Sequence, residues 1–501
     1  MSERSITKSR DLLNRRGFLM GAGAVCAGAL TGGWGKPLGE VGKLTLVSLP
    51  DPLEKCNEVW DASAFGYRVD EYLMSGSGPT FAPISDTEAG KADRPNTSIP
   101  WGQRDTAYAA NLPADFSPRP QSGIGNYTTR IILYRPRDPK KFSGNLIMEP
   151  FHPGGTIEVF SVANRFFLAR GDAVVHIDVP GRFDSVKKFS EERYGRLSMP
   201  DRSLFWTSVS QFATLLKIGG PNSPLPVPMR HLYMTGYSGS ADTVYTFLSY
   251  HHQLTRTPDG KPVFSGYLPM SHLMPVPPID AVIVTTATQS DMFGATDGDT
   301  PATRAFRTAF NSDARDARRR RYEVPGAFHA PFQPPEPGMA IPLRERGSGM
   351  FAACMAAQNW PAEAQPNHVP NRAMLEACFH HASRWAADGV APPHAPLIDT
   401  DADGKILTDE NGNAKGGVRF PDIAVPVETF IPAARGGTRS CASTGYSLPF
   451  SREKLVALYS NREQYLALYD AVADKLVKDG FILPKAAAQL KSDRQWLAPV
   501  F

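Results

Sequence analysis

A serine between two glycines is the most chemically informative feature of the chain. The segment Gly236-Tyr237-Ser238-Gly239-Ser240 follows an apolar run and precedes a helix-like pattern. A sharp turn from strand to helix suits a nucleophilic serine, because the turn projects the hydroxyl clear of the sheet and small neighbours let strand and helix pack closely. Ser240 stands where this motif usually has a second glycine, and serine is the next smallest practical choice. A plain Gly/Ser-rich turn is the alternative interpretation.

An acid and a histidine follow in the order that a serine nucleophile requires. Asp291 ends the predicted strand "VIVTTATQSD", and His329 follows the strand-like "YEVPGAF". Catalytic groups gather at the carboxyl ends of strands in open α/β sheets. We therefore predict a triad of Ser238, Asp291 and His329, in which the histidine takes the serine proton and the aspartate fixes the histidine tautomer. Asp297 and Asp299 are rival acids, since a loop could present either.

Main-chain donors for a developing negative charge are predicted at two places. Gly239, directly after the serine, should offer its amide at the start of the following helix. Gly154 and Gly155 lie in "EPFHPGG", just after the strand-like "NLIM", where a loop could bring a second N–H group close to a ligand. A plain β-turn is the alternative for this segment.

Alternating strands and helices are expected to position these residues. The apolar patterns predict strands within 127–136, 145–151, 171–181, 231–239 (strand and turn), 279–291 and 320–329, and helices within 156–170, 203–218 and 241–250. This alternation predicts the α/β class, with a mostly parallel sheet covered by helices on both faces.

Composition divides the chain into four predicted parts. Residues 1–33 form a signal segment, and residues 34–125, rich in Pro, Gly and Ser, form an irregular N-terminal β region. Residues 126–345 carry the alternating core. Residues 346–501 change to helices and loops, such as the helix ended by Gly389, and form an extension packed on the core as a possible lid.

The first part predicts export. Arg15-Arg16 precedes an uncharged run of small and apolar residues, which resembles the twin-arginine signal of bacteria. We expect the export machinery as a partner, cleavage near residues 27–29, and a periplasmic or secreted product; a membrane anchor is the alternative. No later stretch is long and apolar enough to span a bilayer.

Charge and cysteine spacing argue against other functions. The formal net charge is +4, and residues 1–30, with five Lys/Arg against two Asp/Glu, account for +3 of it. The nearly neutral remainder gives no electrostatic case for binding nucleic acid. Four cysteines remain after the signal, with three possible pairings, and none has zinc spacing; they are Cys56, Cys354, Cys378 and Cys441. We expect neither a cofactor nor a metal.

One further motif has the spacing of a calcium loop. "DTDADGKILTDE", residues 399–410, places acidic residues and Gly404 as such loops do. Proline-rich sequence before it cannot be a helix, and "NGNAKGG" after it forms turns. A β-hairpin with Asp-Gly and Asn-Gly turns is therefore the favoured interpretation, and calcium binding is the alternative.

With these motifs the chain resembles the large exported bacterial α/β-hydrolase-domain proteins over most of residues 60–500. The resemblance rests on "GYSGS", "TATQSD", "YEVPGAFH", "GNAKGGVRFPDIAVP" and the segment from "LPFSREKL" to "KDGFILP". It implies an α/β-hydrolase fold and supports the same three triad residues. It says little about substrate, because one fold carries many chemistries.

The expected activity is hydrolysis of a small carboxylic ester through an acyl-serine intermediate. Lactone or amide hydrolysis, or acyl transfer, could use the same triad. A catalytically dead, hydrolase-like binding protein is an alternative of another class. A dinucleotide-binding oxidoreductase would need a glycine-rich turn after the first strand, and "GYSGSA" comes too late in the chain.

Overall fold

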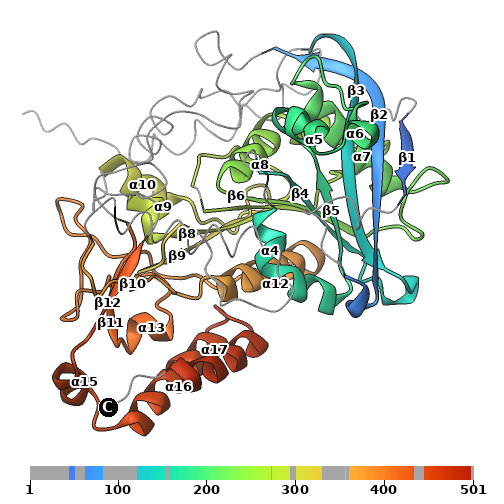
Figure 1. Ribbon diagram of the computed structural model, residues 1–501. Coiled ribbons are helices and arrows are strands. Elements are labelled where there is room, and N and C mark those ends of the chain that lie inside the picture. Colours follow the sequence, from blue (N-terminus) through green and yellow to red (C-terminus); the bar gives the residue numbers. More distant parts are fainter. Residues whose placement is uncertain are drawn as a thin grey trace, which may run out of the picture. The chain divides into compact units, whose positions relative to one another are not determined.

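The computed structural model (Figure 1) describes residues 44–50, 62–82, 121–152, 157–271, 273–293, 301–329, 360–433 and 445–497, together with Gly155 and Ala356. The chain divides into two compact units, Met1–Pro37 and Leu38–Phe501. All described residues lie in the second unit. The predicted export signal lies outside them.

A nine-stranded sheet runs through the described part of the second unit. Its order is β1-β2-β3-β5-β4-β6-β7-β8-β9. The strands are β1 (Thr45–Leu49), β2 (Tyr67–Phe81), β3 (Gln121–Pro136), β4 (Asn145–Pro150), β5 (Ala173–Ile177), β6 (His231–Tyr237), β7 (Gly266–Met270), β8 (Val282–Thr288) and β9 (Arg319–Val324). From β5 to β9 every neighbouring pair is parallel, as the alternating pattern predicted.

The first three strands are antiparallel and belong to the same sheet. β2 and β3 pair along almost their whole length, from Tyr67 opposite Pro136 to Phe81 opposite Gln121, and β3 pairs with β5. The predicted boundary between residues 125 and 126 therefore falls inside β3. The region predicted as a separate β segment continues the central sheet, because long antiparallel strands can extend its edge without a crossover helix.

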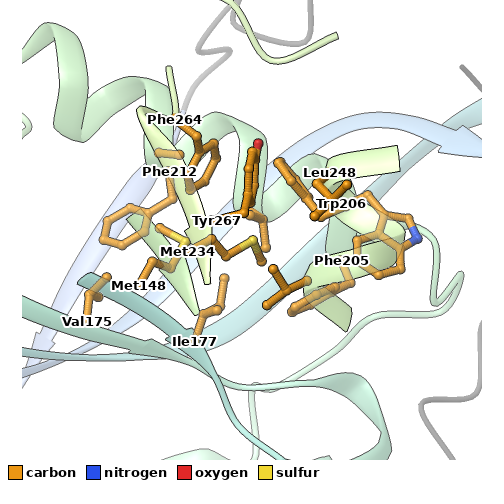
Figure 2. Close-up of a cluster of buried hydrophobic side chains, with 14 of the residues drawn as sticks. Met148, Val175, Ile177, Phe205, Trp206, Phe212, Met234, Leu248, Phe264 and Tyr267 are labelled. Atoms are coloured by element: carbon orange, nitrogen blue, oxygen red, sulfur yellow. The ribbon is translucent and has the colours of Figure 1, made fainter. Parts of the chain in front are cut away.

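Alternating side chains of the central strands divide the core into two clusters. Met148, Val175 and Met234 face a cluster built with α7 (Leu204–Ile218) and α8 (Gly239–Tyr250), as Figure 2 shows for several of its members. Their chain neighbours Ile147, Val174 and Tyr233 face the other cluster. This period of two, with both sets buried, is expected of a sheet covered on both faces.

The second cluster contains α4 (Glu158–Arg170) and α12 (Arg372–Asp388). α12 packs against β6, β7 and β8, and it ends where Gly389 takes a φ of 73°. The helix lies in the segment predicted as a C-terminal extension, yet it covers the central sheet. The predicted boundary after residue 345 therefore separates α12 from the strands of the central sheet that it covers.

The remaining elements lie around this centre (Figure 1). The shorter helices are α5 (Phe183–Phe189), α6 (Glu191–Tyr194), α9 (Gln289–Phe293), α10 (Pro301–Ala309) and α13 (Pro421–Ala424), and the C-terminal ones are α15 (Arg452–Leu458), α16 (Arg462–Lys478) and α17 (Pro484–Leu497). A small sheet has the order β10-β12-β11, with β10 at Gln365–Pro366, β11 at Glu428–Ile431 and β12 at Tyr446–Pro449. Among the residues described, no helix is both long and apolar enough to cross a membrane.

Candidate active site

Ser238 occupies a strained turn between β6 and α8. Its φ is 57° and its ψ is −125°, a conformation that a residue with a Cβ rarely adopts. A side chain at Gly236 would collide with the carbonyl of Ser240, so the strand can approach the helix this closely only with glycine there. Ser240, which stands where the motif usually has a second glycine, forms hydrogen bonds with the end of the strand. Its hydroxyl accepts the Tyr237 N–H and donates to the Tyr237 carbonyl, both at 2.8 Å.

His329 lies between the serine and the aspartate that the sequence singled out. Its Nε2 is 2.9 Å from Ser238 Oγ, and its Nδ1 is 2.6 Å from Asp291 Oδ1. The Asp291 side chain is 1% exposed and the His329 side chain 16% exposed. A carboxylate can only accept hydrogen bonds, so Nδ1 donates to Asp291 and the Nε2 lone pair faces the serine hydroxyl. The structure thus brings the three predicted residues together.

Asp291 is held differently from the sequence expectation. β8 ends at Thr288, and Asp291 lies in the first turn of the short helix α9, three residues beyond the strand. Its Oδ2 accepts the Thr288 N–H at 3.0 Å, and its own N–H donates to Thr288 Oγ1 at 3.2 Å. One carboxylate oxygen is therefore fixed to the strand end while the other contacts His329. The rival acids Asp297 and Asp299 lie outside the described residues.

The turn that carries His329 is fixed from three directions. Gly326, with a φ of 71°, donates its N–H to Gln289 Oε1 of α9 at 2.7 Å and accepts from Asn367 Nδ2 at 2.7 Å. The Tyr237 hydroxyl donates to the His329 carbonyl. Burial, followed by the charges of Asp291 and Glu158, raises the pKa of Tyr237 well above its usual value, so this phenol stays a donor.

Sequence reasoning missed the three residues that hold this turn. Tyr237 stands inside the serine motif and could have been noticed as a buried polar tip beside Ser238. Gln289 lies two residues before Asp291, in a segment that was interpreted as strand. Asn367 has no recognisable signal, because it comes from a distant loop.

The predicted oxyanion donors differ in their surroundings. Gly239 is the first residue of α8, where an N–H group has no partner within the helix. Gly155, with a φ of 91°, donates its N–H to the His152 carbonyl at 2.8 Å, so that amide already has an acceptor. Gly154 lies outside the described residues.

A buried carboxyl group joins β4 to the helix that follows this loop. Glu149 accepts the N–H of Val159 at 2.8 Å and that of Phe160 at 2.9 Å, both in the first turn of α4. Burial outweighs these two hydrogen bonds and raises the pKa of Glu149 to about 8. Burial likewise lowers the pKa of neighbouring His176 to about 3. Both groups are therefore neutral near pH 7, and their 3.8 Å approach is not an ion pair.

No cluster of three or more His, Cys, Asp or Glu side chains that could hold a metal ion occurs in the described portion of the chain. In the calcium-like segment, Asp401 Oδ1 accepts the N–H groups of Asp403 and Lys405, both at 2.9 Å. An antiparallel bridge joins Thr400 to Ile406 across this turn. Asp401, one of the acidic residues with calcium-loop spacing, thus stabilises a tight turn. That this segment does not bind calcium stays a prediction. Cys378 is a buried free thiol, and the other three cysteines lie outside the described residues.

Comparison with known proteins identifies one family. The family model described as alpha/beta hydrolase domain matches residues 38–492. No curated protein sequence matches the chain significantly.

Two solved structures show weak likeness. A protein assigned as a dienelactone hydrolase from Klebsiella pneumoniae aligns at 11% identity with a TM-score of 0.27, over 40% of this chain and 82% of its own. A bacterial brefeldin A esterase, described as a homologue of human hormone-sensitive lipase, aligns at 14% identity with a TM-score of 0.20, over 39% of this chain and 51% of its own.

Proposed function

The chain belongs to the alpha/beta hydrolase domain family, and from that premise we propose that it hydrolyses a carboxylic ester with Ser238 as nucleophile. The predicted fold class is confirmed by the family match and by the mostly parallel, helix-covered sheet. The observation that supports the catalytic proposal most is the position of His329, with Nε2 2.9 Å from Ser238 Oγ and Nδ1 2.6 Å from Asp291.

The proposed reaction proceeds in two halves. His329 Nε2 takes the Ser238 proton as Oγ attacks the ester carbonyl carbon, and the resulting imidazolium is stabilised by the Asp291 carboxylate. The tetrahedral intermediate collapses, the C–O bond to the alcohol breaks, and Nε2 returns the proton to the leaving alkoxide. Water then attacks the acyl-serine with its proton passing to Nε2, and release of the carboxylic acid restores the Ser238 hydroxyl.

The negative charge of each tetrahedral intermediate needs donors placed in advance. We assign the N–H of Gly239 to this role, because it is the first amide of α8 and lies next to the nucleophile. The positive end of the helix dipole favours charge at the same place. Gly154 is the proposed second donor, since the Gly155 amide already donates to the His152 carbonyl.

A fluorophosphonate probe tests the proposal. The wild-type protein should be labelled, and Ser238→Ala should not. Ser238→Ala should also lose roughly a thousandfold or more in ester hydrolysis while keeping its melting temperature, because triad members act as a unit. Near-normal turnover by Ser238→Ala would exclude Ser238 as nucleophile. Esters of graded acyl length, assayed beside lactones and amides, would then identify the substrate class.

Export through the twin-arginine pathway to the periplasm or medium is the second part of the proposal. It rests on Arg15-Arg16 ahead of a weakly apolar segment. Replacing both arginines by lysine should leave uncleaved precursor in the cytoplasm, as detected by fractionation. Normal export of the double variant would rule out this pathway.

A further inference from the structure

A second serine contacts the main chain of the proposed nucleophile. The N–H of Ser238 donates to Ser271 Oγ at 2.9 Å. Ser271 directly follows β7, the strand that pairs with β6. Both serines are buried, with 8% of Ser238 and 1% of Ser271 exposed. This hydrogen bond is therefore shielded from water.

The hydrogen bond extends the sheet by one position beyond its regular ladder. The pairing of β6 with β7 ends with Tyr237 opposite Met270. Ser238 leaves the strand in the next position, where its N–H would otherwise lose its place in the ladder. The Ser271 hydroxyl accepts that N–H, as a strand carbonyl would have done.

Ser271 itself has an unfavourable backbone conformation. Its φ is 74°, and within the described residues only Ser238 and Ser271 combine a positive φ with a side chain. Glycine adopts this conformation without strain, whereas any residue with a Cβ does not. The Ser271 N–H donates to the Thr286 carbonyl of β8 at 2.8 Å, which fixes this backbone to the neighbouring strand. A strained serine where glycine would be easier indicates that its hydroxyl has a role.

We propose that Ser271 is a positioning residue for the nucleophile. Its hydroxyl holds the Ser238 amide, and so keeps the strained turn that directs Ser238 Oγ at His329 Nε2. The proposal rests on the function proposed above, because it assigns to Ser271 an effect on a reaction of Ser238. Without the hydroxyl the Ser238 backbone can relax, and small misplacements of a reacting atom cost large factors in rate.

Ser271→Gly separates positioning from stability. This variant loses the hydroxyl and also relieves the strained φ, so its melting temperature should stay within about 3 °C of wild type. Its kcat should fall roughly ten- to hundredfold with KM within about twofold. The rate of fluorophosphonate labelling should fall in parallel, because labelling reports the same nucleophile.

Two further variants complete the design. Ser271→Ala keeps the strain without the hydroxyl, so it should match the kcat loss of Ser271→Gly and melt at a lower temperature. The matched control is Thr235→Val, which removes another buried hydroxyl bond between the same two strands, from Thr235 Oγ1 to the Leu268 carbonyl at 2.8 Å. Thr235→Val should lose stability and keep its kcat within about twofold.

The outcomes are distinguishable when activity is expressed per probe-labelled site. Unchanged kcat per labelled site in Ser271→Gly and Ser271→Ala would overturn the positioning role while leaving Ser238 as nucleophile. An equal kcat loss in Thr235→Val would also overturn it, because the effect would then be general to the strand pair. A wild-type protein that neither reacts with the probe nor hydrolyses esters would instead overturn the proposed function, and this inference with it.

Discussion

Raising the pH from 6 to 8.5 should destabilise the protein through the buried carboxyl group of Glu149. The side chain is 1% exposed and contacts two amides in the first turn of α4. Its pKa is raised from 4.5 to about 8. In the folded protein it therefore keeps its proton up to about pH 8, whereas in the unfolded chain it has already lost that proton above pH 4.5.

The sign of the effect follows from this difference in bound protons. Between pH 4.5 and about 8 the folded state binds more protons than the unfolded state, so the free energy of unfolding falls as the pH rises. The slope is about 1.4 kcal/mol per pH unit where the difference is a full proton. From pH 6 to 8.5, with a folded pKa of about 8, the loss sums to about 2.5 kcal/mol.

Buried histidines change the stability in the opposite direction, over a pH range that overlaps with that of Glu149. The pKa of His176 is lowered to about 3 by burial, so its unfolded form binds more protons between pH 3 and 6.5 and stability rises with pH there. Burial also lowers the pKa of His252. A comparison with Glu149→Gln cancels these contributions, because the variant keeps every histidine.

The measurement is the difference in melting temperature between wild type and Glu149→Gln across this pH range. At pH 6 wild type should be the more stable, because the amide that replaces the carboxyl group directs its own N–H donor at a backbone N–H, at a cost of about 1–3 kcal/mol. That advantage should shrink by about 2.5 kcal/mol at pH 8.5, or roughly 2–3 °C for a unit of this size. The exposed Glu192→Gln serves as control. A gap between wild type and Glu149→Gln that does not change with pH would refute the raised pKa.

Two substitutions test the proposed triad and its surroundings. Asp291→Asn keeps the shape but favours the wrong His329 tautomer, so we expect a loss in kcat on the order of ten-thousandfold, as for the same change in serine-protease triads; an Asp291→Asn protein that retained most activity would move the acid to another residue. Tyr237→Phe leaves the His329 carbonyl without its donor and should lower kcat about tenfold at unchanged KM. The control is Tyr67→Phe, which removes the hydrogen bond from another buried phenol to the Asp172 carbonyl. Both tyrosine variants should lose about 1–3 kcal/mol of stability, but Tyr67→Phe should keep a normal kcat. Equal kcat in the two variants would contradict a role of Tyr237 in holding the histidine.

The serine and the histidine could be predicted because local chemistry marks them. A strand-to-helix turn with small residues has few sequence solutions, and His329 follows the last strand of the parallel series. Asp291 was predicted for a partly wrong reason. The predicted strand extends to residue 291, whereas β8 ends at Thr288. The sequence pattern does not show that α9 begins at Gln289 and turns the carboxylate back toward the strand end.

β7 was not predicted, and Ser271 was missed with it. The strand reads GYLPM, five residues with a glycine and a proline, and proline is rare in a central strand because it has no N–H for the ladder. Its burial between β6 and β8 overrides that local preference. The position of α12 could not be predicted either, because periodicity shows that a helix has an apolar face but not which strands the face will cover.

Three hydrogen bonds from two serines, Ser240 and Ser271, stabilise the turn at Ser238. Positive φ values at Ser238 and Ser271 cost about 1–3 kcal/mol each. Ser240 makes two hydrogen bonds to the Tyr237 main chain, and Ser271 makes one to Ser238; each contributes about 0.5–1.5 kcal/mol net. The summed cost of about 2–6 kcal/mol and the summed gain of about 1.5–4.5 kcal/mol are therefore of the same order. Ser240, which stands in place of the usual second glycine, supplies two of these three hydrogen bonds, so this serine helps to stabilise the strained turn of the proposed nucleophile.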